Sequence, residues 1–321
     1  MRLRQDEGIE VKSPAQLALM REAGLVTATA LRAAVAAVEP GISTAELDAI
    51  AEREIRAAGA IPSFLGYHGY PATICASVND QIVHGIPRAD QVVHSGDVIS
   101  VDCGAIVGGW HGDAAVTLRV AGPTGAWPGR SDPAYREEEV VGLVEACENA
   151  LWQGLAQAAV GRRLTDISHA IEQAARAAGP YGIVRDYTGH GIGTRMHMDP
   201  PVPNYGPAGR GPVLSAGMTL AIEPMLVLGR PKTRLLDDNW TVVTADGSWA
   251  AHFEHTVAVT EAGPWVLTSE DGGAERFARL RAGGRVTDIT ADDPAHRDAA
   301  AMAGAASPAT GTSSEGARHG L

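Results

Sequence analysis

Cysteine and aromatic residues are scarce in this chain of 321 residues, of which 5% are aromatic and three are cysteine. Cys75, Cys103 and Cys147 are an odd number and form no CxxC pair, so we expect no disulfide framework. The chain has no apolar run of membrane-spanning length and no basic segment leading into an apolar one at its start. We therefore expect neither a membrane helix nor a signal peptide, and we place the protein in a reducing cytoplasm.

Basic residues are also in the minority, since 26 lysines and arginines face 38 aspartates and glutamates, a formal net charge of −12. Such a charge disfavours direct binding to nucleic acid or to an anionic membrane. The remaining composition is typical of a globular protein, with 45% hydrophobic and 20% charged residues. The length suffices for a buried core in one large domain or two.

Apolar residues recur at helical spacing in four long segments. Ser13 is in position to cap the first helix and Pro14 to begin it, and Ser43 or Thr44 opens the second. The predicted helices span residues 14–38, 44–59, 137–160 and 165–179, with an insert near 123–133 and a last helical turn or two at 276–281. Residues 301–321 are rich in Ala, Gly, Ser and Thr without periodicity, and we predict a disordered tail over residues 283–321.

A strand-like segment that ends in a carboxylate occurs twice, at residues 95–102 and 216–223. The second and fourth helices match one another at nearly the same offset. The residues that are equivalent in the two strand-like segments are Gly96 and Gly217, Ile99 and Leu220, Val101 and Ile222, and Asp102 and Glu223. An ionised carboxylate at the end of an apolar strand is unfavourable unless it is paired or binds a cation. We therefore expect one site shared by two duplicated halves.

These patterns predict an α+β protein with two pseudo-symmetric halves, in which antiparallel strands are backed by helices. We expect one domain over residues 9–270, with repeats at about 40–120 and 160–260, because candidate site residues fall in both halves. A His-Gly-Ile tripeptide also occurs once in each half, as His84-Gly85-Ile86 and as His190-Gly191-Ile192.

A hairpin places a second acid beside Asp102. Gly108-Gly109 predicts a two-residue turn, whose register pairs Asp102 with Ala115. Asp113 then lies on the same face as Asp102, one diagonal step away, where backbones are roughly 7–8 Å apart. Two such carboxylates repel one another unless cations are shared between them.

Three further residues complete a candidate metal site of Asp102, Asp113, His190, Glu223 and Glu254. Glu254 lies in a strand-like run, and His190 is flanked by glycines that allow close backbone approach. Four carboxylates and one imidazole without a thiolate suit Mn²⁺, Fe²⁺, Co²⁺ or Zn²⁺ rather than a structural zinc site. Taken singly, each acid is more simply a capped or salt-bridged residue and the histidine a core residue. The duplication and the shared faces favour two-metal hydrolysis.

Eight motifs in this order resemble type I methionine aminopeptidase, a metallopeptidase of the pita-bread fold, over residues 9–269. They are Tyr67-His68-Gly69-Tyr70-Pro71, Cys75-Ala76-Ser77-Val78-Asn79-Asp80, His84-Gly85-Ile86-Pro87, Val101-Asp102-Cys103-Gly104, Trp110-His111-Gly112-Asp113, Gly189-His190-Gly191-Ile192-Gly193, Ile222-Glu223-Pro224 and Phe253-Glu254-His255-Thr256. The resemblance implies a pita-bread fold and removal of the initiator methionine from nascent proteins whose second residue is small. It also implies two divalent metal ions as cofactors, of cobalt, manganese, iron or zinc.

The resemblance also implies how the ions are shared. Asp102 chelates one ion, Asp113 and Glu254 bridge both, and His190 with Glu223 completes the other.

Three catalytic roles are implied in the same way. Glu223 accepts the proton of the attacking water, His197 stabilises the tetrahedral oxyanion, and His84 contacts the leaving nitrogen of the peptide. From the residues alone, the two histidines are polar loop residues.

The resemblance further implies a methionine pocket beside His84 and His197, lined by Phe64, Tyr67, Tyr70, Cys75, Met196 and Trp240. Relatives often carry cysteine in place of Phe64 and phenylalanine in place of Met196. Met198-Asp199 also replaces two glutamates before Pro200. Both pocket substitutions stay apolar, so we expect a methionine pocket of altered shape.

Two alternatives stay open: an X-Pro-type metallo-exopeptidase and a non-catalytic scaffold of the same fold. Prolidase-like relatives carry a large N-terminal domain, for which there is no room before Ser13, and too few residues separate Glu223 from Glu254 for the insertion of type II enzymes. Expected partners are peptides and nascent chains with N-terminal methionine, with the ribosome as a candidate, and the default expectation is a monomer.

Overall fold

The computed structural model describes residues 8–120 and 135–283, and the first two helices start at capping boxes. In α1 (Pro14–Ala36) the Ser13 side chain accepts the backbone N–H of Gln16, whose side chain accepts the N–H of Ser13. Ser43 and Glu46 repeat this arrangement in α2 (Thr44–Ala57). These caps satisfy N–H groups that a helix start leaves unpaired, and both predicted helices are confirmed.

The remaining helices are α3 (Glu137–Leu155), α4 (Leu164–Ala178), α5 (Ala274–Arg281) and the 3₁₀ turn η1 (Tyr67–Gly69). The prediction that the third helix continues to Val160 is wrong. After Leu155 the N–H groups of Gln157 and Ala158 bond the carbonyls of Gly154 and Leu155, three residues back, so the α-helical bonds to the fourth residue back stop there. The predicted insert at 123–133 and, beyond Gly283, the predicted tail lie outside the described residues.

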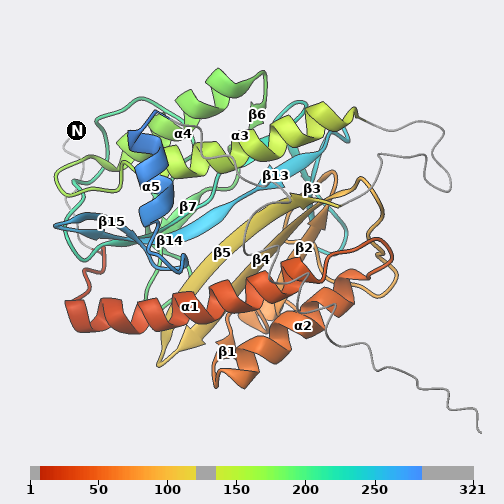
Figure 1. The fold of residues 1–321 in the computed structure, drawn as a ribbon, viewed down its shortest axis with the longest axis horizontal. Coiled ribbons are helices and arrows are strands. Elements are labelled where there is room, and N and C mark those ends of the chain that lie inside the picture. The colour runs from red at the N-terminus through yellow and green to blue at the C-terminus, as the bar shows by residue number, and fades with distance from the viewer. Residues whose placement is uncertain (1–7, 121–134, 284–321) are drawn as a thin grey trace, which may run out of the picture. The chain divides into compact units, whose positions relative to one another are not determined.

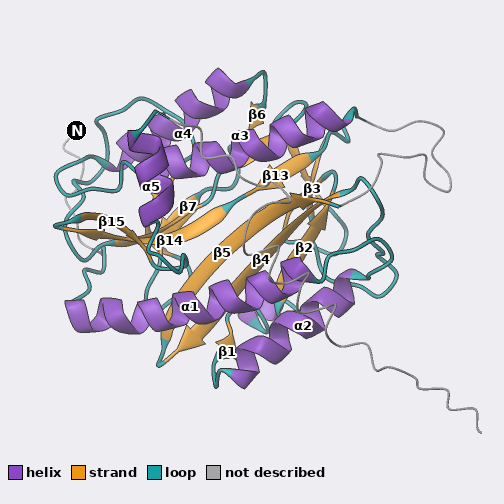
Figure 2. Ribbon diagram, in the orientation of Figure 1, coloured by secondary structure: helices purple, strands orange, loops and turns teal. Residues whose placement is uncertain are grey.

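The strands form one large antiparallel sheet and two small ones (Figure 2). The large sheet has the order β1–β4–β5–β14–β9–β7–β8, with β2 also paired to β4 and β15 to β14. Its members are β1 (Ile61–Pro62), β2 (Ile74–Val78), β4 (Val98–Val107), β5 (Trp110–Arg119), β7 (Gly189–Gly191), β8 (Met198–Val202), β9 (Thr219–Ile222), β14 (Glu254–Thr260) and β15 (Gly263–Val266). The small sheets are β13 (Ala250–His252), β10 (Met225–Val227) and β6 (Gly182–Ile183), and β11 (Thr233–Leu235), β12 (Val242–Thr244) and β3 (Gln81–Val83).

The predicted hairpin register is confirmed, because Asp102 pairs with Ala115 and Gly104 with Asp113. The prediction that Asp102 ends its strand is wrong: β4 continues to Val107, since the pairing with β5 runs as far as the turn. Glu223 does follow directly after β9.

A local pseudo-two-fold axis passes between the adjacent strands β5 and β14, with β4 and β9 outside them. The Thr256 hydroxyl donates to the carbonyl of Asp113 and accepts its N–H, at 2.9 and 3.0 Å. The Thr117 hydroxyl makes the same two bonds with the backbone of His252, at 2.6 and 2.8 Å. Thr117 thus corresponds to Thr256, and His252 corresponds to Asp113.

The repeated His-Gly-Ile tripeptide that contains His84 and His190 is not part of this symmetry. His190 pairs with Ala221 of β9, whose counterpart in β4 is Ser100, and Ser100 pairs with Ser77. The structural counterpart of His190 is therefore Ser77.

Helices cover each half of the sheet separately (Figure 1). α1 and α2 pack on β2, β4 and β5, and α3 packs with α4 and against β5, β10 and β13. Leu47, Ile55 and Ile99 belong to the first core, and Leu151 and Leu220 to the second. All described residues belong to one compact unit, and none of its helices has the length and apolar character needed to cross a bilayer.

The crossing of α1 over β5 depends on Gly112, and we expect Gly112→Ala to destabilise the protein. A Cβ at Gly112 would lie 2.8 Å from the Cα of Gly24 in α1, so helix and strand must separate. The expected loss is about 1–3 kcal/mol of unfolding free energy, measured by denaturant titration. The matched control is Gly142→Ala in α3, whose Cβ would meet only the movable Tyr181 hydroxyl. Equal stability of the two variants would contradict this account of the crossing.

Candidate active site

The candidate acids of both halves lie along one row across the large sheet. Asp102 of β4 pairs with Ala115 of β5, and Ala115 in turn pairs with Glu254 of β14. Glu223 directly follows Ile222, which pairs with the residue after Glu254. Because alanine fills the position between two of the acids, space is left above the sheet for their carboxylates to converge.

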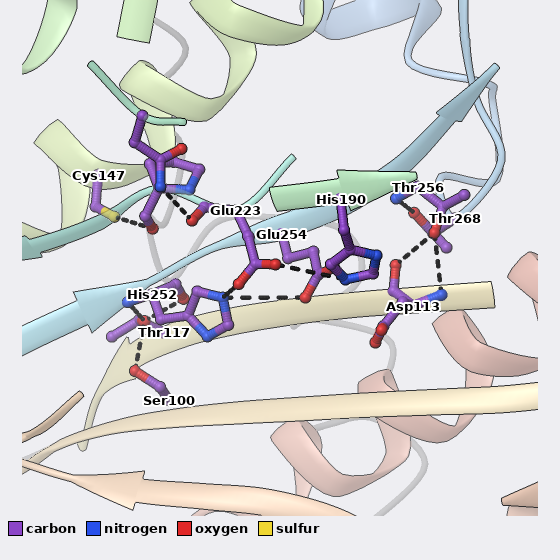
Figure 3. Close-up of polar contacts among 12 residues, drawn as sticks. Ser100, Asp113, Thr117, Cys147, His190, Glu223, His252, Glu254, Thr256 and Thr268 are labelled. Carbon is purple, nitrogen blue, oxygen red and sulfur yellow. Dashed lines mark hydrogen bonds and ion pairs between the residues drawn. The ribbon is translucent and has the colours of Figure 1, made fainter. Parts of the chain in front are cut away.

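The next row on the same face contributes Asp113 and His190. Asp113 lies two residues before Ala115 in β5, and His190 of β7 pairs with Ala221, two residues before Glu223. Figure 3 shows Asp113, His190, Glu223 and Glu254 directed toward one another. One ligand atom from each of Asp113, His190 and Glu254 lies within 4.8 Å of the others.

The four acids are held in a protein interior. Asp102, Asp113 and Glu254 are at most 9% exposed. Burial raises the pKa of Asp102 to about 7 and that of Glu223 to about 8. The pKa values of Asp113 and Glu254 are raised well above the usual range, first by burial and then by the neighbouring carboxylates.

Several of these oxygens have no hydrogen-bond partner in the part of the chain that the structure describes, namely Asp102 Oδ1, Asp113 Oδ1 and Glu254 Oε1. His190 donates from Nδ1 to the Gly191 carbonyl at 3.0 Å, and burial lowers its pKa to about 3. Its Nε2 lone pair is then free at 3.5 Å from Glu223 Oε1. Buried, unpartnered carboxylate oxygens beside a neutral imidazole fit divalent cations, so the residues present suit a metal site.

Two further candidate histidines border this cluster. The His197 ring centroid lies 4.3 Å from that of His190, and its Nδ1 is 2.8 Å from the Tyr67 hydroxyl. His84 has a φ of 60° and lies edge-on to Tyr187 at 5.6 Å. Burial, followed by the charges of neighbouring histidines, lowers the pKa of His84 to about 4, so it is neutral near pH 7.

The residues expected to bind methionine form one apolar cluster. Its members are Phe64, Tyr70, Ala72, Cys75 and Met196, with Tyr67, Ile86 and Trp240 packed against them. Tyr70 is fixed by hydrogen bonds from its hydroxyl to the carbonyls of Ile74 and Gly85. Cys75 pairs with Asp102 across β2 and β4, so the cluster adjoins the acids.

Sequence reasoning missed Tyr187, Ile86 and His252. Tyr187 lies two residues before the motif at residues 189–193, and Ile86 lies within the motif at residues 84–87, so each had a positional signal in the sequence. His252 shares the face of Glu254, yet nothing in the pattern indicated its distance from Glu223.

Comparison with known proteins identifies the family to which the chain belongs. Residues 18–261 match metallopeptidase family M24. The chain is 55% identical over 272 residues to methionine aminopeptidase 1 of Mycobacterium tuberculosis, covering 83% of this chain and 97% of that protein. It is 47% identical over 257 residues to methionine aminopeptidase 1 of Bacillus subtilis, covering 80% and 98%.

Solved structures confirm the predicted pita-bread fold. Methionine aminopeptidase of Thermotoga maritima superposes with a TM-score of 0.76 at 39% identity, covering 82% of this chain and 100% of that one. Prolidase of Pyrococcus furiosus shares the fold with a TM-score of 0.60 at 21% identity, covering 81% and 65%. The chain therefore belongs to metallopeptidase family M24 and groups within it with the methionine aminopeptidases.

Proposed function

We propose that this protein is a metal-dependent aminopeptidase that removes methionine from the N-terminus of peptides and nascent proteins. The proposal depends on one observation, that the apolar cluster adjoins the buried acids. Cys75 of the cluster pairs with Asp102 across β2 and β4. A methionine side chain in that cluster would present its own peptide carbonyl to the acids, which is the geometry that an exopeptidase needs.

Five residues would hold two divalent ions: Asp102, Asp113, His190, Glu223 and Glu254. The unpartnered oxygens of Asp102, Asp113 and Glu254 support this assignment. Bound ions would supply Lewis acidity and lower the pKa of water at the site. The ligand set accepts manganese, iron, cobalt or zinc.

The protein's own groups would then orient the peptide and move protons. Glu223 lies at the end of the acid row and would accept a proton from water. His197, positioned by Tyr67, would donate to the oxyanion, and neutral His84 would contact the leaving nitrogen. Phe64 and Met196 contribute apolar side chains to the cluster, which suits the unbranched apolar side chain of methionine.

We further propose a small residue at the second position of the substrate, a cytoplasmic location and a monomeric state. The ribosome remains the candidate partner that would present nascent chains.

The test offers Met-Ala-Ser and a Gly-Pro dipeptide to protein loaded anaerobically with each of the four metals. We expect release of methionine from the tripeptide and no turnover of the dipeptide, since the apolar cluster fits a methionine side chain. Cleavage of the dipeptide alone would instead identify an X-Pro peptidase. Failure to bind any divalent ion would identify a scaffold.

A further inference from the structure

The Glu223 carboxylate lies between two imidazoles, one facing each of its oxygens. His190 Nε2 is 3.5 Å from Oε1, and His252 Nε2 is 3.6 Å from Oε2 (Figure 3). His252 is 2% exposed, and its Nε2 has no hydrogen-bond partner within residues 8–120 and 135–283. A buried polar atom without a partner at a site of this kind calls for an explanation.

The two imidazoles cannot serve the same purpose. Because the Nδ1 of His190 donates to a backbone carbonyl, its Nε2 offers a lone pair. His252 Nε2 faces acceptors instead, Glu223 Oε2 at 3.6 Å and Glu254 Oε2 at 3.9 Å. Between two ionised carboxylates, the state that bound cations would impose on Glu223 and Glu254, an N–H is favoured over a lone pair.

The backbone of His252 is fixed from both sides. The Thr117 hydroxyl accepts the backbone N–H of His252 and donates to its carbonyl. The Ser100 hydroxyl lies 2.8 Å from the Thr117 hydroxyl. On the other edge, His252 pairs with Met225 of β10, two residues after Glu223. The separation of His252 and Glu223 is therefore set by two strand pairings.

We propose that His252 is a positioning residue that donates a hydrogen bond from Nε2 to Glu223 Oε2. The observed gap is a few tenths of an ångström beyond hydrogen-bond length, and a small rotation of the Glu223 side chain closes it. The bond leaves Oε1 directed toward His190 and the metal site. His252 occupies the pseudo-symmetric position of Asp113, so one duplicated position supplies a metal ligand and the other orients the proton acceptor. This role rests on the function proposed for Glu223.

The test compares wild type with His252→Leu and His252→Gln, because leucine removes the donor and glutamine keeps an N–H of similar reach. For His252→Leu we expect kcat on Met-Ala-Ser to fall about 10–100-fold with KM changed less than about twofold. His252→Gln should retain kcat within about threefold. Anaerobic Co²⁺ titration followed by visible absorption should show an unchanged stoichiometry in both variants, with about tenfold weaker binding in His252→Leu.

Other outcomes overturn the proposal. If His252→Leu equals wild type in kcat and in Co²⁺ affinity, His252 positions nothing. If both variants lose one equivalent of Co²⁺, His252 is itself a ligand, in a group with Glu223 and Glu254 whose ligand atoms lie within 4.8 Å of one another. His169→Gln on α4, whose ring bonds the carbonyl of Gly206, is the matched control for a histidine elsewhere.

Folding is checked by thermal unfolding of the metal-free proteins. If the leucine variant does not fold, His252→Asn replaces it, because the asparagine side chain is too short to reach Glu223. The kcat of His252→Asn is then expected to be about 10–100-fold below that of His252→Gln. Equal kcat of the asparagine and glutamine variants would overturn the proposal. Wild type that fails to cleave Met-Ala-Ser would reject the proposed function, whereas weaker Co²⁺ binding by His252→Leu would still support the positioning of Glu223.

Discussion

Replacement of Glu254 by glutamine is expected to lower kcat on Met-Ala-Ser by at least about 10³-fold, or roughly 4 kcal/mol in activation free energy. Glu254 is the central acid of the row, and it belongs both to the cluster with Asp113 and His190 and to that with Glu223 and His252. An amide keeps its shape but removes the charge that would hold both ions. Asp113→Asn should act in the same direction. Steady-state rates with metal in excess and metal content after dialysis measure the effect.

The matched control is Glu52→Gln. Glu52 forms an exposed i,i+4 ion pair with Arg56 on α2, and such pairs contribute little to stability. This variant should match wild type in rate and metal content. A Glu254→Gln enzyme that keeps more than about a tenth of the wild-type rate would show that the ligands have been assigned wrongly.

Much of this site could be predicted from the sequence because it depends on local pattern. The turn at Gly108-Gly109 determines the register that pairs Asp102 with Ala115, and alternation then places Asp113 on the same face. The duplicated segment ending in Glu223 likewise indicated that a second strand would face the same cavity. Capping serines determined where the first two helices begin.

The parts that could not be predicted depend on contacts between distant segments. The position of His252 relative to Glu223 requires both the β10–β13 pairing and the bonds from Thr117. Similarly, α3 stops at Leu155 although its apolar spacing continues, because the following residues bond carbonyls three residues back and Gly161 then donates to the distant carbonyl of Leu214. Periodicity describes which face is buried, and it does not indicate where the chain must turn back.

The pseudo-symmetry explains why a buried site of like charges exists at all. Each half contributes one acid at the equivalent place, Asp102 and Glu223, and the axis between β5 and β14 brings them into one row. The halves have diverged at two neighbouring positions, since Asp113 corresponds to His252, and Ala115 corresponds to Glu254, with which it pairs. The acids of both halves therefore surround one space, and only the first half has an aspartate at the position of Asp113.

Stability of the metal-free protein is expected to fall as pH rises from 6.5 to 8. The folded-state pKa is about 7 for Asp102 and about 8 for Glu223, whereas both ionise near pH 4 in an unfolded chain. In this interval the folded state binds protons that the unfolded state does not, so the unfolding free energy decreases with pH. Buried histidines such as His84 act oppositely, because an unfolded histidine with a pKa of about 6.5 is still half protonated at the start of this interval; each offsets only about 0.4 kcal/mol, less than either acid contributes.

The expected change is a loss of about 2 kcal/mol or more, since one proton contributes at most about 1.4 kcal/mol per pH unit and Asp113 and Glu254, whose pKa values are also raised, retain protons in the folded state as well. It corresponds to several degrees in Tm, measured by scanning calorimetry of chelator-treated protein. Saturating Mn²⁺ should raise Tm and remove the decline, because bound cations replace the protons between the carboxylates. Metal-free Glu254→Gln should show a shallower decline, since one ionisable group is gone and its neighbours then repel one another less. A Tm of metal-free wild type that is constant or rises between pH 6.5 and 8 would contradict the buried, unneutralised acids on which the metal site depends.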